Sequence, residues 1–278
     1  MSELIFLKLG GSLLTDKTQP QALRADVLAR LAAEVADALA ARPALRLVIG
    51  HGSGSFGHMA ARRYNTRAGV ASREEWRGYA ETARAAALLN RRVVDALWEA
   101  GAPALALQPS ASALCRDGEL LALEDRPVRV ALDNGLVPVL YGDVALDSVR
   151  GGTIVATEEL FAWLAPRLAP QRIVLVGEVA GVLSADPASG VAGELIEVIT
   201  PALLPDLAQA LGGARGVDVT GGMAAKAAAM LALVQAVPAL AAVQIISGLT
   251  AGLVRAVLCD ADLRVGTRIV ADSRPPGR

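Results

Sequence analysis

Short apolar segments that end in glycines alternate with segments of helical periodicity along this chain of 278 residues. Leu4–Leu9 runs into Gly10-Gly11, Leu45–Ile49 runs into a glycine-rich turn, and Val137–Tyr141 runs into Gly142-Asp143. Such apolar runs, separated by helical segments, are typical of parallel strands that are buried on both faces. The composition agrees, because 53% of the residues are hydrophobic and 3% are aromatic. We therefore expect an α/β fold with a mainly parallel central sheet covered on both faces.

The same reading assigns the other elements. Helices are predicted over Ala25–Arg42, Arg73–Ala100, Glu158–Leu168, Pro201–Leu211 and Met223–Ala236; strands are predicted over Ala104–Leu107, Arg172–Val176, Val182–Ser184, Glu194–Val198, Val243–Ile246 and Thr267–Val270. Ligands of parallel sheets bind beyond the carboxyl ends of the strands. Backbone N–H groups in glycine turns and at helix starts favour phosphate there.

The charges exclude some partners. Lys and Arg number 27 against 28 for Asp and Glu, so the chain carries no net charge that would attract nucleic acid or an anionic membrane. Cys115 and Cys259 are far apart in the sequence, which favours free thiols and a cytoplasmic protein. The N-terminus does not resemble a signal peptide, and we expect no membrane span.

The first segment that is a candidate for a functional site is Lys8-Leu9-Gly10-Gly11-Ser12. Glycines let the backbone approach a phosphate closely, although a simple tight turn would show the same pattern. Lys8 interrupts an apolar strand, where an unpaired ammonium is costly, and this favours a phosphate as its partner. Lys17 is a further candidate for a functional residue, because it follows the glycine turn by a few residues.

The second segment, which we expect to be a loop, is His51–His58, and it holds both histidines of the chain. Histidine donates hydrogen bonds to oxyanions, so we favour a functional role for at least one of them over a core histidine in a glycine turn. Gly52-x-Gly54-x-x-Gly57 also matches the dinucleotide fingerprint. The acidic residue that this fingerprint needs at the end of a second strand is missing, because Glu74 and Glu75 open a helix.

The third segment, Asp218–Lys226, reads as a capped helix start with two glycines and a lysine one turn inside. A polyphosphate could rest on its N-terminal amides while Lys226 contacts an outer phosphate; an ordinary capped helix with a surface lysine is the alternative. The chain contains no Walker A motif, no protein-kinase motifs and no Gly-x-Ser-x-Gly elbow with a distal histidine.

Together, the three segments resemble the amino acid kinase superfamily over nearly the whole chain. Gly-Gly-Ser-x-x-Thr-x-Lys followed by His-Gly-x-Gly-Ser-Phe-Gly-His is similar to the isopentenyl phosphate kinases within it. The resemblance implies a three-layer αβα sandwich, one continuous fold, in which residues 1–170 bind the phosphoryl acceptor and residues 171–278 bind ATP. It also implies ATP and Mg²⁺ as cofactors, a small-molecule phosphate substrate and a homodimer. As above, we expect no nucleic-acid or membrane partner.

The resemblance further implies roles for single residues. His58 would donate a hydrogen bond to the acceptor phosphate, Lys8 would lie beside the transferred phosphoryl group, and Lys17 would stabilise the transition state. The acceptor site would also include Gly52, Gly57 and Thr157, and the nucleotide site would include Lys8, Gly10, Gly11, Ser12, Ser53, Glu178, Gly222 and Lys226. No metal ligand is assigned among the side chains.

The sequence departs from the family pattern at three places. Ser53 replaces a glycine of the archaeal type, and Gly177–Val182 differs at three positions from the family's nucleotide segment, although Asp186-Pro187 is kept. Thr157-Glu158-Glu159 stands where relatives carry a stretch like Gly-Asp-Asp.

The implied reaction is the phosphorylation of isopentenyl phosphate by ATP in isoprenoid precursor synthesis. A phosphate monoester oxygen is already deprotonated near neutral pH, so no general base is needed, and His58 would bind and orient. Tyr79, Ala83 and Ala86 are candidates for the wall around the hydrocarbon tail. Alternatives are a kinase of the same superfamily acting on a phosphonate such as fosfomycin or another phosphomonoester, a silent nucleotide sensor, and a Rossmann oxidoreductase.

Overall fold

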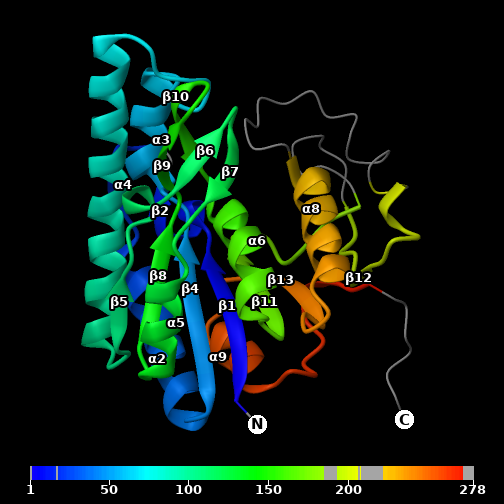
Figure 1. Ribbon diagram of the computed structural model, residues 1–278. Helices are drawn as coiled ribbons and strands as arrows, with labels where there is room; N and C mark the ends of the chain where they lie inside the picture. The colour runs from blue at the N-terminus through cyan, green and yellow to red at the C-terminus, as the bar shows by residue number, and fades with distance from the viewer. Residues whose placement is uncertain (1, 17, 185–192, 206, 208–221, 272–278) are drawn as a thin grey trace.

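An eight-stranded sheet lies at the centre of the computed structural model, which describes residues 2–16, 18–184, 193–205, 207 and 222–271 (Figure 1). The strand order is β12-β14-β13-β11-β1-β4-β8-β5. These strands are β1 (Glu3–Leu9), β4 (Leu45–His51), β5 (Ala104–Ala106), β8 (Val137–Tyr141), β11 (Arg172–Gly177), β12 (Val198–Ile199), β13 (Ala242–Ser247) and β14 (Thr267–Ile269).

The sheet is mainly parallel, as the sequence predicts. Among the neighbours, β13 and β14 pair antiparallel, whereas the other pairs run parallel. The pairing of β1 with β11 joins two groups of strands: one group comes from before residue 171 and the other from after it. The carboxyl ends of the central strands β4, β1, β11 and β13 therefore meet along one edge.

Helices cover both faces, which confirms the three-layer sandwich. One layer packs α1 (Gly11–Leu14), α2 (Ala25–Ala41), α4 (Arg73–Glu99) and α9 (Leu253–Cys259) against the sheet; the other packs α5 (Arg126–Asp133), α6 (Thr157–Leu168) and α8 (Gly222–Ala236). Figure 1 shows α6 and α8 across the sheet from α4. Side chains alternate along a strand, so Leu4 and Phe6 of β1 enter the core on the α6 side, while Ile5 and Leu7 enter the other core.

A second sheet of four short strands lies beside the carboxyl end of β8. Its order is β10-β9-β6-β7, with β6 (Leu114–Arg116), β7 (Glu119–Ala122), β9 (Asp143–Asp147) and β10 (Gly151–Val155). A small hairpin of β2 (Thr15–Asp16) and β3 (Ala22–Leu23) follows α1, and a 3₁₀ turn, η1, spans Pro109–Ala111. None of these elements was predicted from the sequence.

The structure corrects the expected loop at His51–His58. His51 is the last residue of β4, and α3 (Gly54–Arg63) begins only three residues later, so His58 lies on a helix. Where the two strands Val182–Ser184 and Glu194–Val198 are expected, the structure has one antiparallel bridge, between Leu183 and Leu195, and Val198 begins β12. Of the helix predicted at Pro201–Leu211, residues 206 and 208–211 lie outside the described residues.

The remaining predicted helices and strands occur within a few residues of their expected bounds. Both cysteines are free thiols, and Cys115 is buried. In the described ranges, no helix is long and apolar enough to cross a membrane.

Candidate functional site

Glycine turns from neighbouring strands meet at the carboxyl edge of the sheet. The Gly10 amide after β1 donates to the Val176 carbonyl of β11 (2.8 Å), and the Gly52 amide after β4 donates to the Leu9 carbonyl (3.1 Å). After β13, the Gly248 amide donates to the Gly177 carbonyl (2.7 Å). The Gly10 amide is therefore used by the sheet, which leaves the amides of the following turn, α1, for an anion.

The turns after β1 and β4 are in direct backbone contact. A Cβ atom built on Gly11 would lie 2.5 Å from the Gly54 amide nitrogen. Gly50, one residue before the end of β4, leaves no space either, because its Cβ would lie 2.4 Å from a methyl carbon of Thr157. Glycine at these positions follows from close approach of two backbones in one case and of a helix to a strand in the other.

Lys8 pairs with a carboxylate that was not predicted as its partner from the sequence. The alternation along β1 turns Lys8 toward α6, where its Nζ lies 2.5 Å from Oε1 of Glu158. Both side chains are largely buried, with 17% and 21% of their surface exposed. An ammonium inside an apolar strand is costly without a partner, and Glu158 supplies a permanent one.

Glu158 also faces Lys226 of α8. Burial opposes ionisation of Glu158, but attraction and a hydrogen bond to Lys8, its own backbone N–H and attraction to Lys226 outweigh it, so its pKa is lowered. Lys226 is half-buried and is the sole charged residue in the sequence of α8. One carboxylate thus lies within the field of two lysines from distant parts of the chain.

His51 is a core histidine, the alternative that the sequence left open. Its ring is fully buried and stacks on Tyr141 with centroids 5.6 Å apart. Nδ1 lies 3.0 Å from the Gly52 carbonyl and Nε2 lies 3.1 Å from Oδ1 of Asn90. Burial lowers its pKa despite both contacts, so the ring is neutral near neutral pH. His51 holds the glycine turn against α4.

His58, in contrast, is exposed on α3. Its Nδ1 lies 3.1 Å from the hydroxyl oxygen of Ser53, the residue that precedes the helix. Gly57 leaves room for Ser53, because a Cβ there would lie 2.6 Å from the Ser53 Cβ. The serine that departs from the archaeal pattern therefore contacts His58.

Thr157 is buried behind the turn after β4. Its hydroxyl donates to the His51 carbonyl (2.7 Å), which also accepts from the Gly142 amide (3.0 Å). Thr157 thereby ties the first residue of α6 to the ends of β4 and β8. Its predicted contact with the acceptor stays a prediction.

The remaining predicted nucleotide residues lie around β11, β13 and α8. Glu178 follows β11 and pairs with Arg24 (2.8 Å), while its carbonyl accepts from the Ser247 hydroxyl (3.3 Å). Gly222 is the first residue of α8, and Ser12 lies in α1. Lys17, residues 218–221 and Asp186-Pro187 lie outside the described residues.

The three residues expected at the hydrocarbon tail occupy one side of α4. The Tyr79 ring packs on Gly152 of β10, where a Cβ would lie 2.8 Å from it, and Ala86 lies beside Gly57 of α3. Ala83 is half-buried between them in the sequence of the helix. Burial, with smaller effects of Asp143 and Cys115, raises the pKa of Tyr79 to about 12, so its hydroxyl is protonated.

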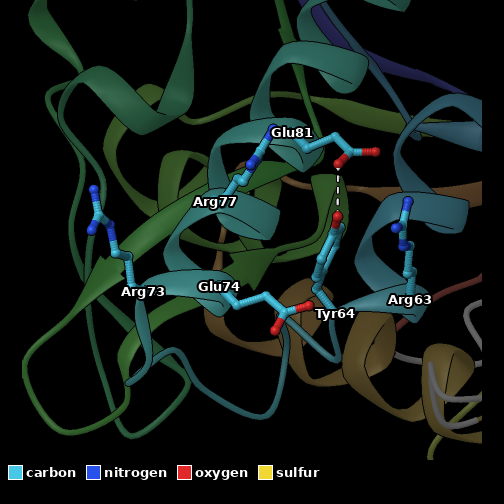
Figure 2. Close-up of a pocket in the computed structure, with 6 residues that line it drawn as sticks. All are labelled: Arg63, Tyr64, Arg73, Glu74, Arg77 and Glu81. Carbon is cyan, nitrogen blue, oxygen red and sulfur yellow. Dashed lines mark hydrogen bonds between the residues drawn. The ribbon is translucent and has the colours of Figure 1, made fainter.

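Two hollows lie between α3 and α4, apart from the Lys8–Glu158 pair. The first, of about 880 Å³, is lined by Arg63, Tyr64, Arg73, Glu74, Arg77 and Glu81 (Figure 2). Figure 2 shows the Tyr64 hydroxyl bonded to Glu81, at 3.0 Å, and Arg73 directed away from them. The second, of about 220 Å³, is lined by apolar side chains such as Phe56, Met59 and Ala60 and also by polar ones, among them Gln21, Glu81 and Arg84. The candidate site is thus defined by contacts at the sheet edge rather than by either hollow.

Comparison with known proteins agrees with this fold. The model of the amino acid kinase family matches residues 3–244. The isopentenyl phosphate kinase of Haloferax volcanii is 42% identical over 83% of this chain and 88% of its own length; that of Methanothermobacter thermautotrophicus is 36% identical over 84% and 87%. A crystal structure of an isopentenyl phosphate kinase superposes with a TM-score of 0.80 and 32% identity, covering 96% of this chain and 100% of that one. The chain therefore belongs to the amino acid kinase family.

Proposed function

We propose that the protein transfers the γ-phosphoryl group of ATP to isopentenyl phosphate, giving isopentenyl diphosphate and ADP. One observation carries this proposal: the turn that follows Lys8 touches the turn that leads to His58, beside the carboxylate shared by Lys8 and Lys226. Two phosphate-binding turns in contact suit a reaction that joins two phosphates. The relatives that match most of the chain are isopentenyl phosphate kinases.

The acceptor belongs, in this proposal, to residues 1–170 and the nucleotide to residues 171–278. The strands before residue 171 carry the turn of His58, and the part after it carries α8 with Lys226. The meeting of β1 with β11 brings the two groups together, so the phosphoryl group would cross the sheet edge at Lys8. Gly52, Gly57 and Thr157 would surround the acceptor phosphate with His58.

The main task of such a site is to offset the repulsion between the two negatively charged phosphates. Two unit charges about 4 Å apart at an effective dielectric near 20 repel by roughly 4 kcal/mol. Lys8 and Lys226 would offset this repulsion, and Lys17 would stabilise the transition state. Glu158 would keep the two ammonium groups in place before the anions arrive. The acceptor oxygen attacks without help from a base, so His58 binds and orients.

Magnesium would enter with the nucleotide. Within the described ranges, no group of three or more His, Cys, Asp or Glu side chains is arranged to hold a metal ion. Mg²⁺ in kinases is usually held by phosphate oxygens and one or two carboxylates. When bound, the ion would neutralise charge on the β- and γ-phosphates.

An ADP-release assay tests the proposal. ATP and Mg²⁺ are offered with isopentenyl, dimethylallyl and geranyl phosphates, fosfomycin, UMP and acetylglutamate. We expect the highest kcat/KM with isopentenyl phosphate, and product analysis should show its diphosphate. Preferred turnover of fosfomycin or another acceptor would refute isopentenyl phosphate as the substrate, but kinase activity would stand. No ADP release with any acceptor would count against kinase activity itself.

We also propose a cytoplasmic homodimer. The free thiols favour a reducing compartment. Trp98 and Leu105, 58% and 39% exposed, lie at the end of α4 and on β5, the last strand at one edge of the central sheet. Exposed apolar groups at a sheet edge favour association. Light scattering of the purified protein measures the mass, and a monomer at micromolar concentration would refute the dimer.

A further inference from the structure

Thr15 joins the two phosphate-binding turns through one hydroxyl group. It is the first residue of β2, directly after α1, and it is fully buried. Its Oγ1 donates to the Gly11 carbonyl (2.8 Å) and accepts from the Ser55 amide (2.9 Å). Gly11 belongs to the turn after β1, and Ser55 belongs to the first turn of α3. The hydroxyl is therefore a single atom shared by both turns.

The glycines around this hydroxyl make room for it. A Cβ on Gly54 would lie 2.3 Å from Oγ1 of Thr15, and Gly54 has a φ of +50°. A Cβ on Gly11 would meet the backbone of the same Gly54. The backbones therefore touch on one side and are joined by the Thr15 hydroxyl on the other. A sliding motion of one turn against the other would break the hydrogen bond from the Ser55 amide, while the bond to Gly11 holds the hydroxyl on its own turn.

We propose that Thr15 is a positioning residue that fixes the separation between the transferred phosphoryl group and the acceptor phosphate. This inference rests on the proposed function, in which the turn beside Lys8 holds the phosphoryl group and the turn of α3 holds the acceptor. Thr15 contacts neither phosphate in this scheme. It sets the relative position of the groups that do, and reaction rates depend steeply on such positions.

Two substitutions separate the hydroxyl from the rest of the side chain. Thr15→Val keeps the shape and removes both hydrogen bonds, whereas Thr15→Ser keeps the hydroxyl. We expect Thr15→Val to lower kcat about 10- to 100-fold, the size of effect that a displacement near 1 Å has on reacting groups. Each substrate, measured separately by calorimetry, should bind within a few-fold of the unchanged protein, because each turn keeps its own contacts. Thr15→Ser should retain kcat within about threefold.

Thr82 provides a matched control. It is also buried, and its hydroxyl also donates to the carbonyl four residues earlier, that of Gly78, at 2.8 Å. Thr82→Val removes the same kind of bond within α4, so it measures the general cost of losing a buried threonine hydroxyl. We expect its kcat to stay near that of the unchanged protein.

Several outcomes decide the matter. A normal kcat in Thr15→Val, or an equal loss in Thr82→Val, would overturn the proposal. A fall of kcat in Thr15→Ser by about 10-fold or more would do the same, because the methyl group and not the hydroxyl would then be responsible. This result needs no comparison with Thr15→Val, so it decides even if the valine variant does not fold. All rates are referred to the acceptor that the unchanged protein turns over best, so a wrong substrate assignment is seen separately, in the acceptor panel.

Discussion

The ammonium of Lys8 lies 2.5 Å from Oε1 of Glu158, across 150 residues of chain. Lys8 is on β1 and Glu158 is in the first turn of α6, so the pair links the central sheet to a covering helix. The carboxylate also attracts Lys226. A lysine that is held in place before an anion binds needs little reorganisation in the transition state.

Replacing Glu158 by Gln should therefore lower kcat. The amide keeps a hydrogen-bond acceptor but removes the charge that Lys8 and Lys226 share, so we expect a loss of about 10-fold or more. The KM for ATP should fall or stay unchanged, because the site becomes more positive by one charge. Steady-state kinetics at varied ATP measures both constants.

Glu159→Gln is the control for this change. Glu159 pairs with the half-exposed Arg67 (3.1 Å) and accepts from the Ala156 amide, a cap that glutamine can also form. Its kinetics should be nearly unchanged. An unaltered kcat in Glu158→Gln would show that the carboxylate does not position the lysines.

The sequence identified Lys8 but not its carboxylate, for a physical reason. Lys8 stands out because an ammonium within an apolar strand needs a partner, which is a local property. The partner is decided by which helix covers that face of the sheet, and no local pattern contains this information. A usable signal was present: Thr157-Glu158-Glu159 opens a helix after a strand, at the sheet edge where ligands bind.

The two histidines show a second limit. Glycine content predicts a loop at His51–His58, yet His51 ends β4 and His58 lies on α3, so one is buried against Asn90 and the other is exposed. The short strands of the second sheet were missed for a related reason. A strand such as Leu114–Arg116 has three residues, too few to show the alternation that identifies strands.

His58→Gln should raise the KM for the acceptor several-fold and keep kcat within about 10-fold, because the amide can still donate a hydrogen bond. His58→Ala should cost about 10- to 100-fold in kcat/KM, the usual worth of a hydrogen bond to a charged group. Kinetics at varied acceptor distinguishes the two constants, and Arg62→Gln, on the exposed part of the same helix, is the control. Normal acceptor binding with abolished turnover in His58→Gln would contradict an orienting role.

Ala83→Phe should shorten the preferred acceptor chain. A phenyl ring on this side of α4, between Tyr79 and Ala86 in the sequence, would fill space that we assign to the hydrocarbon tail. We expect kcat/KM for geranyl phosphate to fall more than that for isopentenyl phosphate. The control is Ala80→Phe, which places the same ring at an exposed position of the helix. An unchanged ratio of kcat/KM for the two acceptors in Ala83→Phe would show that this side of α4 does not line the site of the hydrocarbon tail.

Asp147 provides a test of stability outside the site. Its buried carboxylate accepts hydrogen bonds from four backbone amides of the turns beside it, those of Asp117, Gly118, Val149 and Arg150, at 2.7–3.0 Å. Burial alone would raise its pKa, but these four donors outweigh it and lower the pKa from 3.8 to about 2. The charged form is therefore the one that stabilises the fold.

Asp147→Asn should lower the free energy of unfolding by about 1–3 kcal/mol at pH 7, because the amide nitrogen cannot accept. A lowered pKa contributes stability that is present above the unfolded value of 3.8 and is lost as the pH falls towards 2. The difference between the two proteins should thus be constant from pH 7 to about pH 5 and shrink below pH 4. Urea unfolding at pH 7, 5 and 3 measures it, with Asp133→Asn as control, since Asp133 is 68% exposed and pairs with Arg46 at the surface. A difference that stays the same at pH 3 would mean that the Asp147 carboxylate keeps no preference for its charged form, and that the turns are held by other contacts.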